Sequence, residues 1–109
     1  MFAFEIPGQR FSMPAGADVE RFRFVSINAS SEGIAATAAT PIVGVSMNKV
    51  KAGEVLEIAD GIVMVEAGAA VTAGVAVTAD AEGRAVAGEG TAVALTAATA
   101  AGDVITVKL

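Results

Sequence analysis

Residues 54–66 decide the fold, and they read Glu54-Val-Leu-Glu-Ile-Ala-Asp-Gly-Ile-Val-Met-Val-Glu66. Apolar and polar side chains alternate on both sides of a central Asp60-Gly61, which is the pattern of a half-buried strand. Asp-Gly is a strong signal for a two-residue type I′ turn, because both central residues of that turn adopt positive φ. The stretch therefore predicts a β-hairpin.

The turn also fixes which side chains share a face of the hairpin. Pairing across Asp60-Gly61 places four apolar residues together, and we expect them to be buried: Leu56, Ile58, Val63 and Val65. The opposite, mixed face is expected to point outward. Turn chemistry and side-chain alternation agree on this register, and a slip of one residue would invert both faces.

Further short runs rich in Val and Ile flank the hairpin, divided by Gly, Asp and Asn. They predict strands at residues 22–28, 42–47, 75–79, 84–87, 92–96 and 104–108. Asp80-Ala-Glu-Gly83 is expected to close a second hairpin. Seven or eight short strands with frequent turns predict an all-β fold, a small antiparallel β-sandwich or barrel. Only residues 96–101 are ambiguous, because an Ala-rich six-residue run suits a turn of helix or a loop.

The dipeptide Ala-Gly precedes three of the predicted strands, at Ala52, Ala73 and Ala101. The spacings of 21 and 28 residues are irregular, so they do not indicate a solenoid. We interpret the recurrence as a turn device rather than as a duplication.

Residues 1–20 are expected to form an extended N-terminal arm before a single β-rich body at residues 21–109. Two Pro and two Gly in the arm exclude a helix and limit strands to short pieces. The arm is also rich in large apolar side chains, namely Phe2, Phe4, Ile6, Phe11 and Met13. Such side chains must be buried, either on the body or on a partner. Phe22 and Phe24 are expected to begin the first strand of the body and to join its core.

The composition excludes several kinds of chemistry. Ala, Val, Gly and Thr occupy 60 of the 109 positions, and the chain has no Cys, His, Trp or Tyr. A disulfide framework, a Cys/His zinc site and a catalytic relay based on histidine are therefore impossible. The length suits one compact domain rather than a multidomain enzyme.

Charge and hydropathy exclude two kinds of partner. The net charge is −5, all of it carried by residues 25–109, which argues against binding to nucleic acid. The longest charge-free window, residues 33–48, is shorter than a membrane-spanning helix and contains Pro41. The N-terminus lacks the basic segment of a signal peptide. We expect a soluble protein that binds neither nucleic acid nor a membrane.

The candidate sites for chemistry are weak. Glu54, Glu57 and Glu66 share the predicted hairpin, but charged residues on strands are commonly a guard against aggregation. Asp80-Ala-Glu-Gly83 lacks the alternating oxygen ligands of a calcium loop. Gly88-Glu-Gly90 lacks the third Gly and the helix of a dinucleotide-binding fingerprint. We therefore assign no catalytic, metal or cofactor-binding residue.

One alternative is a small β domain that carries biotin or lipoate on a hairpin lysine. Val50-Lys-Ala-Gly-Glu-Val55 is similar to segments of such domains, and Lys49 would be the modified residue. However, Lys49 lies in Asn-Lys-Val rather than in the usual Met-Lys-Met or Asp-Lys-Ala. The apolar arm would also have no role in a carrier domain.

Several turn-and-strand segments together resemble the small capsid cement, or decoration, proteins of tailed bacteriophages. The matching segments are Pro41-Ile-Val-Gly-Val45, Val50-Lys-Ala-Gly-Glu54, Val65-Glu-Ala-Gly-Ala69, Val71-Thr-Ala-Gly74, Asp80-Ala-Glu-Gly-Arg-Ala85 and Ala100-Ala-Gly-Asp-Val-Ile105. No segment is specific alone, and the resemblance lies in their order and spacing over residues 22–109.

The resemblance implies a β-rich structural protein of the virion that sits on the outer capsid surface as an oligomer, usually a trimer. Its implied partner is the major capsid protein, and it implies no catalytic residue and no cofactor. The arm is least covered by the resemblance. Because interfaces favour aromatic residues and Met, we expect Phe2, Phe4, Ile6, Phe11 and Met13 to contact the capsid or a sister subunit.

Overall fold

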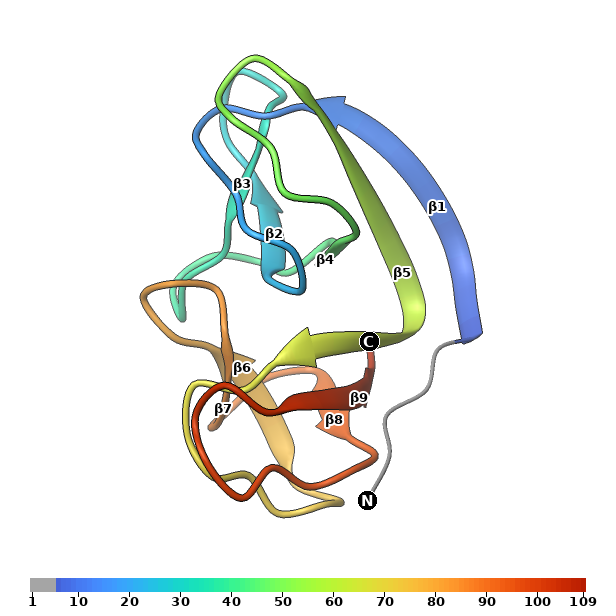
Figure 1. The fold of residues 1–109 in the computed structure, drawn as a ribbon, viewed down its shortest axis with the longest axis vertical. Helices are drawn as coiled ribbons and strands as arrows, with labels where there is room; N and C mark the ends of the chain where they lie inside the picture. The colour runs from blue at the N-terminus through green and yellow to red at the C-terminus, as the bar shows by residue number, and fades with distance from the viewer. Residues whose placement is uncertain (1–5) are drawn as a thin grey trace.

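The fold is all-β, as the sequence predicts. The computed structural model describes residues 6–109, and no helix occurs among them. Nine strands are present: β1 (Ile6–Pro14), β2 (Phe24–Ile27), β3 (Gly33–Ala35), β4 (Gly44–Ser46), β5 (Val55–Glu66), β6 (Ala76–Ala79), β7 (Ala85–Ala87), β8 (Ala92–Ala94) and β9 (Val104–Lys108). They pair antiparallel in the order β3-β2-β4-β5-β9-β8-β6-β7, and β1 pairs with β5. Figure 1 shows two lobes joined by the long β5.

The predicted hairpin at Asp60-Gly61 is wrong, because β5 continues through both residues as one strand of 12. Gly61 does adopt a positive φ of 107°, but it bends the strand instead of reversing it. The N–H of Gly61 donates to Asp60 Oδ1 at 2.8 Å, and its carbonyl accepts from the N–H of Leu109 at 2.9 Å. Each half of β5 pairs with other strands, and that long-range pairing outweighs the local turn preference.

The predicted buried face is nevertheless confirmed. The side chains of Leu56, Ile58, Val63 and Val65 are all fully buried. In a straight strand, even- and odd-numbered residues point to opposite faces. The bend at Gly61 shifts this alternation, so that both halves of β5 turn their apolar side chains inward.

β1 is longer than the short strand pieces expected for the arm. It pairs with β5 from Ile6 opposite Ile62 to Pro14 opposite Val55. A register irregularity between Pro7 and Gln9 accommodates the first proline, and the second ends the strand.

The two lobes are an internal structural repeat. Repeat 1 (residues 10–59) contains β1, β2, β3, β4 and the first half of β5. Repeat 2 (residues 62–108) contains the second half of β5, then β6, β7, β8 and β9, paired in the same order. The second half of β5 therefore occupies the place in repeat 2 that β1 occupies in repeat 1.

The pairing registers of the two repeats match residue by residue. In repeat 1 Val25 pairs with Ala35, and in repeat 2 Val77 pairs with Ala87, both 52 positions later. The match extends to the bent strand, where the pairing of β1 with the first half of β5 recurs as the pairing of the second half of β5 with β9.

The turns correspond as well. Within the described residues, positive φ occurs at three equivalent pairs and at Gly61, which lies at the junction of the repeats. The pairs are Phe22 and Gly74, Ser31 and Gly83, and Gly53 and Gly102. The three Ala-Gly dipeptides are thus turns, as interpreted. The fold nevertheless contains a duplication, in which the turns at Gly53 and Gly102 are equivalent.

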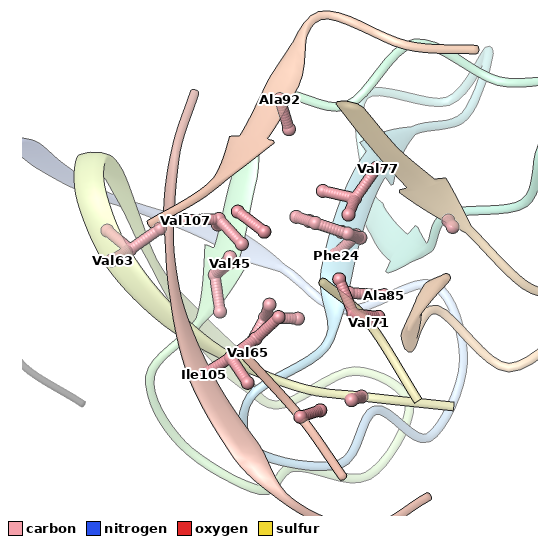
Figure 2. Packing of buried hydrophobic residues seen from close by; sticks show 14 of the residues in the cluster. Phe24, Val45, Val63, Val65, Val71, Val77, Ala85, Ala92, Ile105 and Val107 are labelled. Atoms are coloured by element: carbon pink, nitrogen blue, oxygen red, sulfur yellow. The ribbon is translucent and has the colours of Figure 1, made fainter. Parts of the chain in front are cut away.

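Each repeat has its own core on the inner face of its curled sheet. A small cluster in repeat 1 contains Ala15, Val19, Val25, Val50, Leu56 and Ile58. A larger cluster combines the inner face of repeat 2 with the outer face of repeat 1, which contributes Phe24, Ala36, Val45 and Ala59. Figure 2 shows the Phe24 ring pointing into this larger cluster. Phe24 is a core residue, as expected, whereas Phe22 is half-buried beside Arg21.

Two local expectations are settled by the structure. Asp80-Ala-Glu-Gly83 closes the hairpin of β6 and β7, as predicted, with Ala79 opposite Ala85. Residues 96–101 are a loop and not a turn of helix, and Ala98 within it forms a bridge to Val71.

Candidate interaction surface

The predicted interface residues fall into three situations. Phe2 and Phe4 lie outside the described residues. Ile6 belongs to β1, where its backbone pairs with that of Ile62. Phe11 is 37% exposed at the rim of the inner face of repeat 1, while Met13 is half-buried and packs on the core cluster of that repeat.

The exposed face of β1 carries two shallow hollows. One, of about 320 Å³, is lined by Arg10, Phe11, Ser12 and Glu57, and Arg10 Nη2 lies 3.7 Å from Glu57 Oε2. The other, of about 230 Å³, is lined by Ser12, Met13, Pro14 and Val55. The first hollow therefore places an aromatic ring beside an exposed ion pair.

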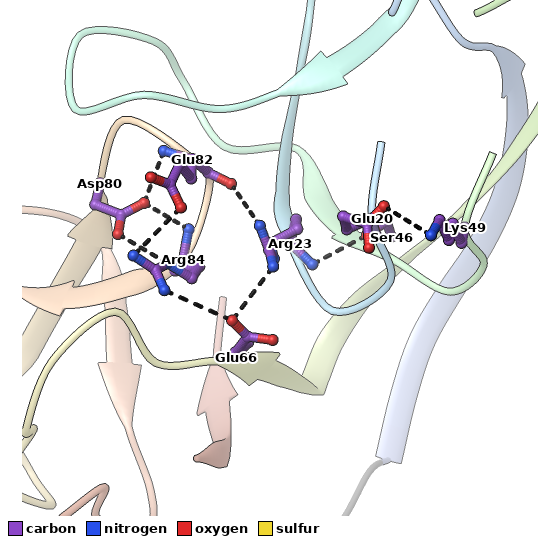
Figure 3. A network of polar contacts seen from close by, with 8 residues as sticks. All are labelled: Glu20, Arg23, Ser46, Lys49, Glu66, Asp80, Glu82 and Arg84. Carbon is purple, nitrogen blue, oxygen red and sulfur yellow. Dashed lines mark hydrogen bonds and ion pairs between the residues drawn. The ribbon is translucent and has the colours of Figure 1, made fainter. Parts of the chain in front are cut away.

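The two repeats are held together by a polar network that the sequence analysis did not find (Figure 3). Glu66 Oε2 lies 3.2 Å from Arg23 Nη2 and 3.8 Å from Arg84 Nη1. Arg23 Nη1 also donates to the carbonyl of Glu82 at 3.2 Å, and Arg84 Nε donates to Asp80 Oδ2 at 3.2 Å. Arg23 belongs to repeat 1, whereas Glu66, Glu82 and Arg84 belong to repeat 2, so these contacts cross the junction between the repeats.

Asp80 has a lowered pKa within this network. Partial burial acts to raise the pKa, but the N–H groups of Arg84 and Glu82 and the Arg84 guanidinium together lower it below its usual 3.8. A carboxyl whose pKa falls on folding stabilises the folded state above its unfolded pKa. That stabilisation is lost as the pH falls through the lower, folded pKa.

We expect Asp80→Asn to lower the free energy of unfolding by about 1 kcal/mol at neutral pH, because the pair with Arg84 is partly exposed. The gap from wild type should close below about pH 3.8. Thermal melts of both proteins between about pH 2 and 7 measure this gap. A gap that is constant over the whole range would contradict the role of the Asp80 charge.

The acidic candidates for catalysis have structural partners. Glu54 Oε1 accepts the N–H of Lys51 in the turn before β5. Glu57 pairs with Arg10, and Glu66 belongs to the network between the repeats. They do not face one another across a hairpin, because that hairpin does not form.

The two loops considered for ligands also have structural roles. Asp80 Oδ1 accepts the N–H groups of Glu82 and Arg84, which shapes the turn before β7. Residues 88–90 lie in the connection between β7 and β8, which contains no helix. Among residues 6–109, no three acidic side chains gather in a way that could hold a metal ion. In the same range, no helix is long and apolar enough to cross a membrane.

Lys49 lies in the connection between β4 and β5, with its side chain 74% exposed. Its Nζ lies 3.4 Å from Glu20 Oε2, beside a hollow of about 480 Å³ lined by Asp18, Glu20, Lys49, Val50, Lys51 and Glu54. The adjacent Val50 is bridged to Val19 by two backbone hydrogen bonds of 2.9 Å. Lys49 therefore lies in a braced connection rather than at the tip of a tight hairpin.

The fold defines an all-β protein built from two repeats, and comparison with known proteins identifies its family. A family model described as phage cement protein matches residues 7–109. The structure is similar to that of the head fiber gp8.5 N base in bacteriophage phi29, with a TM-score of 0.79 and 20% identity over 93% of this chain and 92% of that chain. At this identity the likeness shows a shared fold. No curated protein gives a significant match.

The chain belongs to the phage cement protein family, since the family model covers nearly its whole length. It is therefore a structural protein of the phage capsid.

Proposed function

We propose that this protein decorates and stabilises a bacteriophage capsid by binding the outer surface of the major capsid protein lattice as a trimer. The family match over residues 7–109 carries the proposal. The proposed partners are the major capsid protein and sister subunits of this protein. The protein is not an enzyme, needs no cofactor, and is made in the host bacterial cytoplasm before it joins the virion.

We further propose that residues 1–20 act as the arm that contacts neighbouring subunits, with residues 21–109 as the body. Within the described residues β1 pairs with β5 alone, so its other edge is available to a strand of a partner. Phe11 lies on this strand with 37% of its surface exposed. Phe2, Phe4, Ile6 and Met13 complete the proposed contact set. Large apolar side chains at the edge of a small protein are typical anchors of an interface.

Co-sedimentation with capsids of the matching phage tests this function. We expect the protein to sediment with capsids and to raise both the temperature and the low-salt tolerance at which they disrupt. Capsids without the protein and the protein without capsids are the controls. If the purified protein neither sediments with capsids nor changes their disruption, the proposal fails.

No observation favours the carrier alternative. An intact-mass measurement after co-expression with a biotin or lipoate ligase tests it directly. We expect no adduct on Lys49, because its segment is braced and does not form a tight hairpin tip.

A further inference from the structure

Because the two repeats share one fold, each face of repeat 1 has an equivalent face on repeat 2, and the two can differ in whether they are buried. Face A is the outer face of a repeat, at the positions of Phe24 and Val45 in repeat 1. Both are fully buried, because face A of repeat 1 packs against repeat 2. Face B is the rim of the inner face, at the positions of Val63 and Ala79 in repeat 2. These are also buried, in the same cluster.

Face A of repeat 2 and face B of repeat 1 are, in contrast, exposed. Face A of repeat 2 carries Val93, equivalent to Val45, and Leu95, equivalent to Met47, and each is 38% exposed. Face B of repeat 1 carries Phe11, equivalent to Val63, and Ile27, equivalent to Ala79, and each is 37% exposed. The repeats thus pack head to tail and leave one face A and one face B free.

The bulk of the free faces is exchanged relative to the internal interface. Internally, the large side chain is Phe24 on face A, and the small Ala79 lies on face B. On the free faces, Ala76 stands at the position of Phe24, while Ile27 stands at the position of Ala79. Lys108 stands at the position of Ala59, at the edge of the free face A. The free face A has lost the ring of Phe24, and the free face B has gained Ile27 and Phe11, which supports a close-packed contact between them.

We propose that face A of repeat 2 in one copy binds face B of repeat 1 in a second copy, repeating between chains the contact made inside each chain. Such a head-to-tail interface uses two different surfaces, so it builds a closed ring where the rotation per step closes and an open fibre where it does not. The interface deepens the proposed function by assigning Phe11 to a sister subunit, and a ring of three would give the proposed trimer.

Sedimentation of the purified protein tests this interface. We expect wild type to sediment as an oligomer, and Leu95→Glu and Phe11→Glu each to sediment at the 10.8 kDa of one chain. Val55→Glu is the control. Val55 is 62% exposed, and because Val104 at the equivalent position of repeat 2 is also exposed, this position lies outside the internal interface. Val55→Glu should remain oligomeric, and the two monomeric variants should still melt cooperatively, which shows that they are folded.

Mixing the two disrupted variants tests the head-to-tail arrangement. Leu95→Glu keeps face B of repeat 1, and Phe11→Glu keeps face A of repeat 2, so the mixture should form a dimer of twice the chain mass. A monomeric wild type, an oligomeric Leu95→Glu, or a mixture that stays monomeric would each overturn the interface. Capsid co-sedimentation of the same variants separates the proposals, since a monomeric wild type that still binds capsids overturns this interface alone.

Discussion

Replacing Phe24 with alanine is expected to lower the free energy of unfolding by about 3–5 kcal/mol. Phe24 is the bulkiest of the fully buried side chains, and the rest of its cluster is almost entirely Val and Ala. These small side chains have little reach with which to close the cavity left by the ring. Native proteins are stable by only about 5–15 kcal/mol, so this one substitution should remove much of the total.

The effect should also spread across the junction of the repeats. The N–H of Phe24 donates to the carbonyl of Gly83 at 2.7 Å, and the neighbouring Arg23 joins the network to Glu66. Loss of the ring therefore loosens the contact between the repeats as well as the core of repeat 2.

Urea unfolding of Phe24→Ala, Phe24→Leu and Val55→Ala measures this prediction. Phe24→Leu should fall between wild type and Phe24→Ala, because leucine fills part of the space. Val55→Ala should stay within about 0.5 kcal/mol of wild type, since Val55 is 62% exposed. An alanine variant at position 24 as stable as Val55→Ala would show that the ring does not hold the repeats together.

The fold class could be predicted because short alternating runs and Gly turns are local signals. The burial of residues 56, 58, 63 and 65 could be predicted for the same reason. The path of β5 could not, because Asp60-Gly61 suits both a hairpin turn and a bent strand. The choice depends on β1 and β9, which lie far away in the sequence and supply the competing pairing.

The repeat had a sequence signal that the Ala-Gly dipeptides obscured. Ala15-Gly-Ala-Asp-Val19 and Ala67-Gly-Ala-Ala-Val71 are 52 positions apart and differ only at their fourth residue. Each forms the same pair of contacts, including a parallel bridge from its first residue to Gly33 or to Ala85. The four-residue difference between the loops that precede β4 and β8 breaks this spacing further along the chain, so a search for one constant period misses it.

The interaction surface was only partly predictable. The large side chains of the arm are visible in the composition, and Phe11 is indeed exposed. The exposure of Ile27, Val93 and Leu95 was not predictable, because each lies in a run of sequence that predicts a half-buried strand. Only the packing of one repeat on the other decides which equivalent face is covered.

Deleting residues 2–14 is expected to destabilise the protein by more than about 3 kcal/mol, because the deletion removes β1 from repeat 1. In repeat 2 the same place in the sheet is filled by the second half of β5. Without β1, the fully buried Leu56 and Ile58 lose their cover along one edge, and Met13 no longer packs on their cluster. Exposing a buried Leu or Ile costs about 1.5–3 kcal/mol each.

The deletion also bears on the proposed arm, but it removes a strand and a contact surface together. Point variants that keep the backbone of β1 separate the two roles. Phe11→Ser should melt well above the deletion, because it removes one partly exposed side chain and keeps the backbone pairing of β1 with β5. If the arm contacts capsid or sister subunits, Phe11→Ser and the double change of Phe2 and Phe4 to serine should each weaken co-sedimentation with capsids. A truncated protein that melts like wild type would show that β1 does not stabilise the fold. Point variants that sediment with capsids like wild type would show that the arm is not part of the interface.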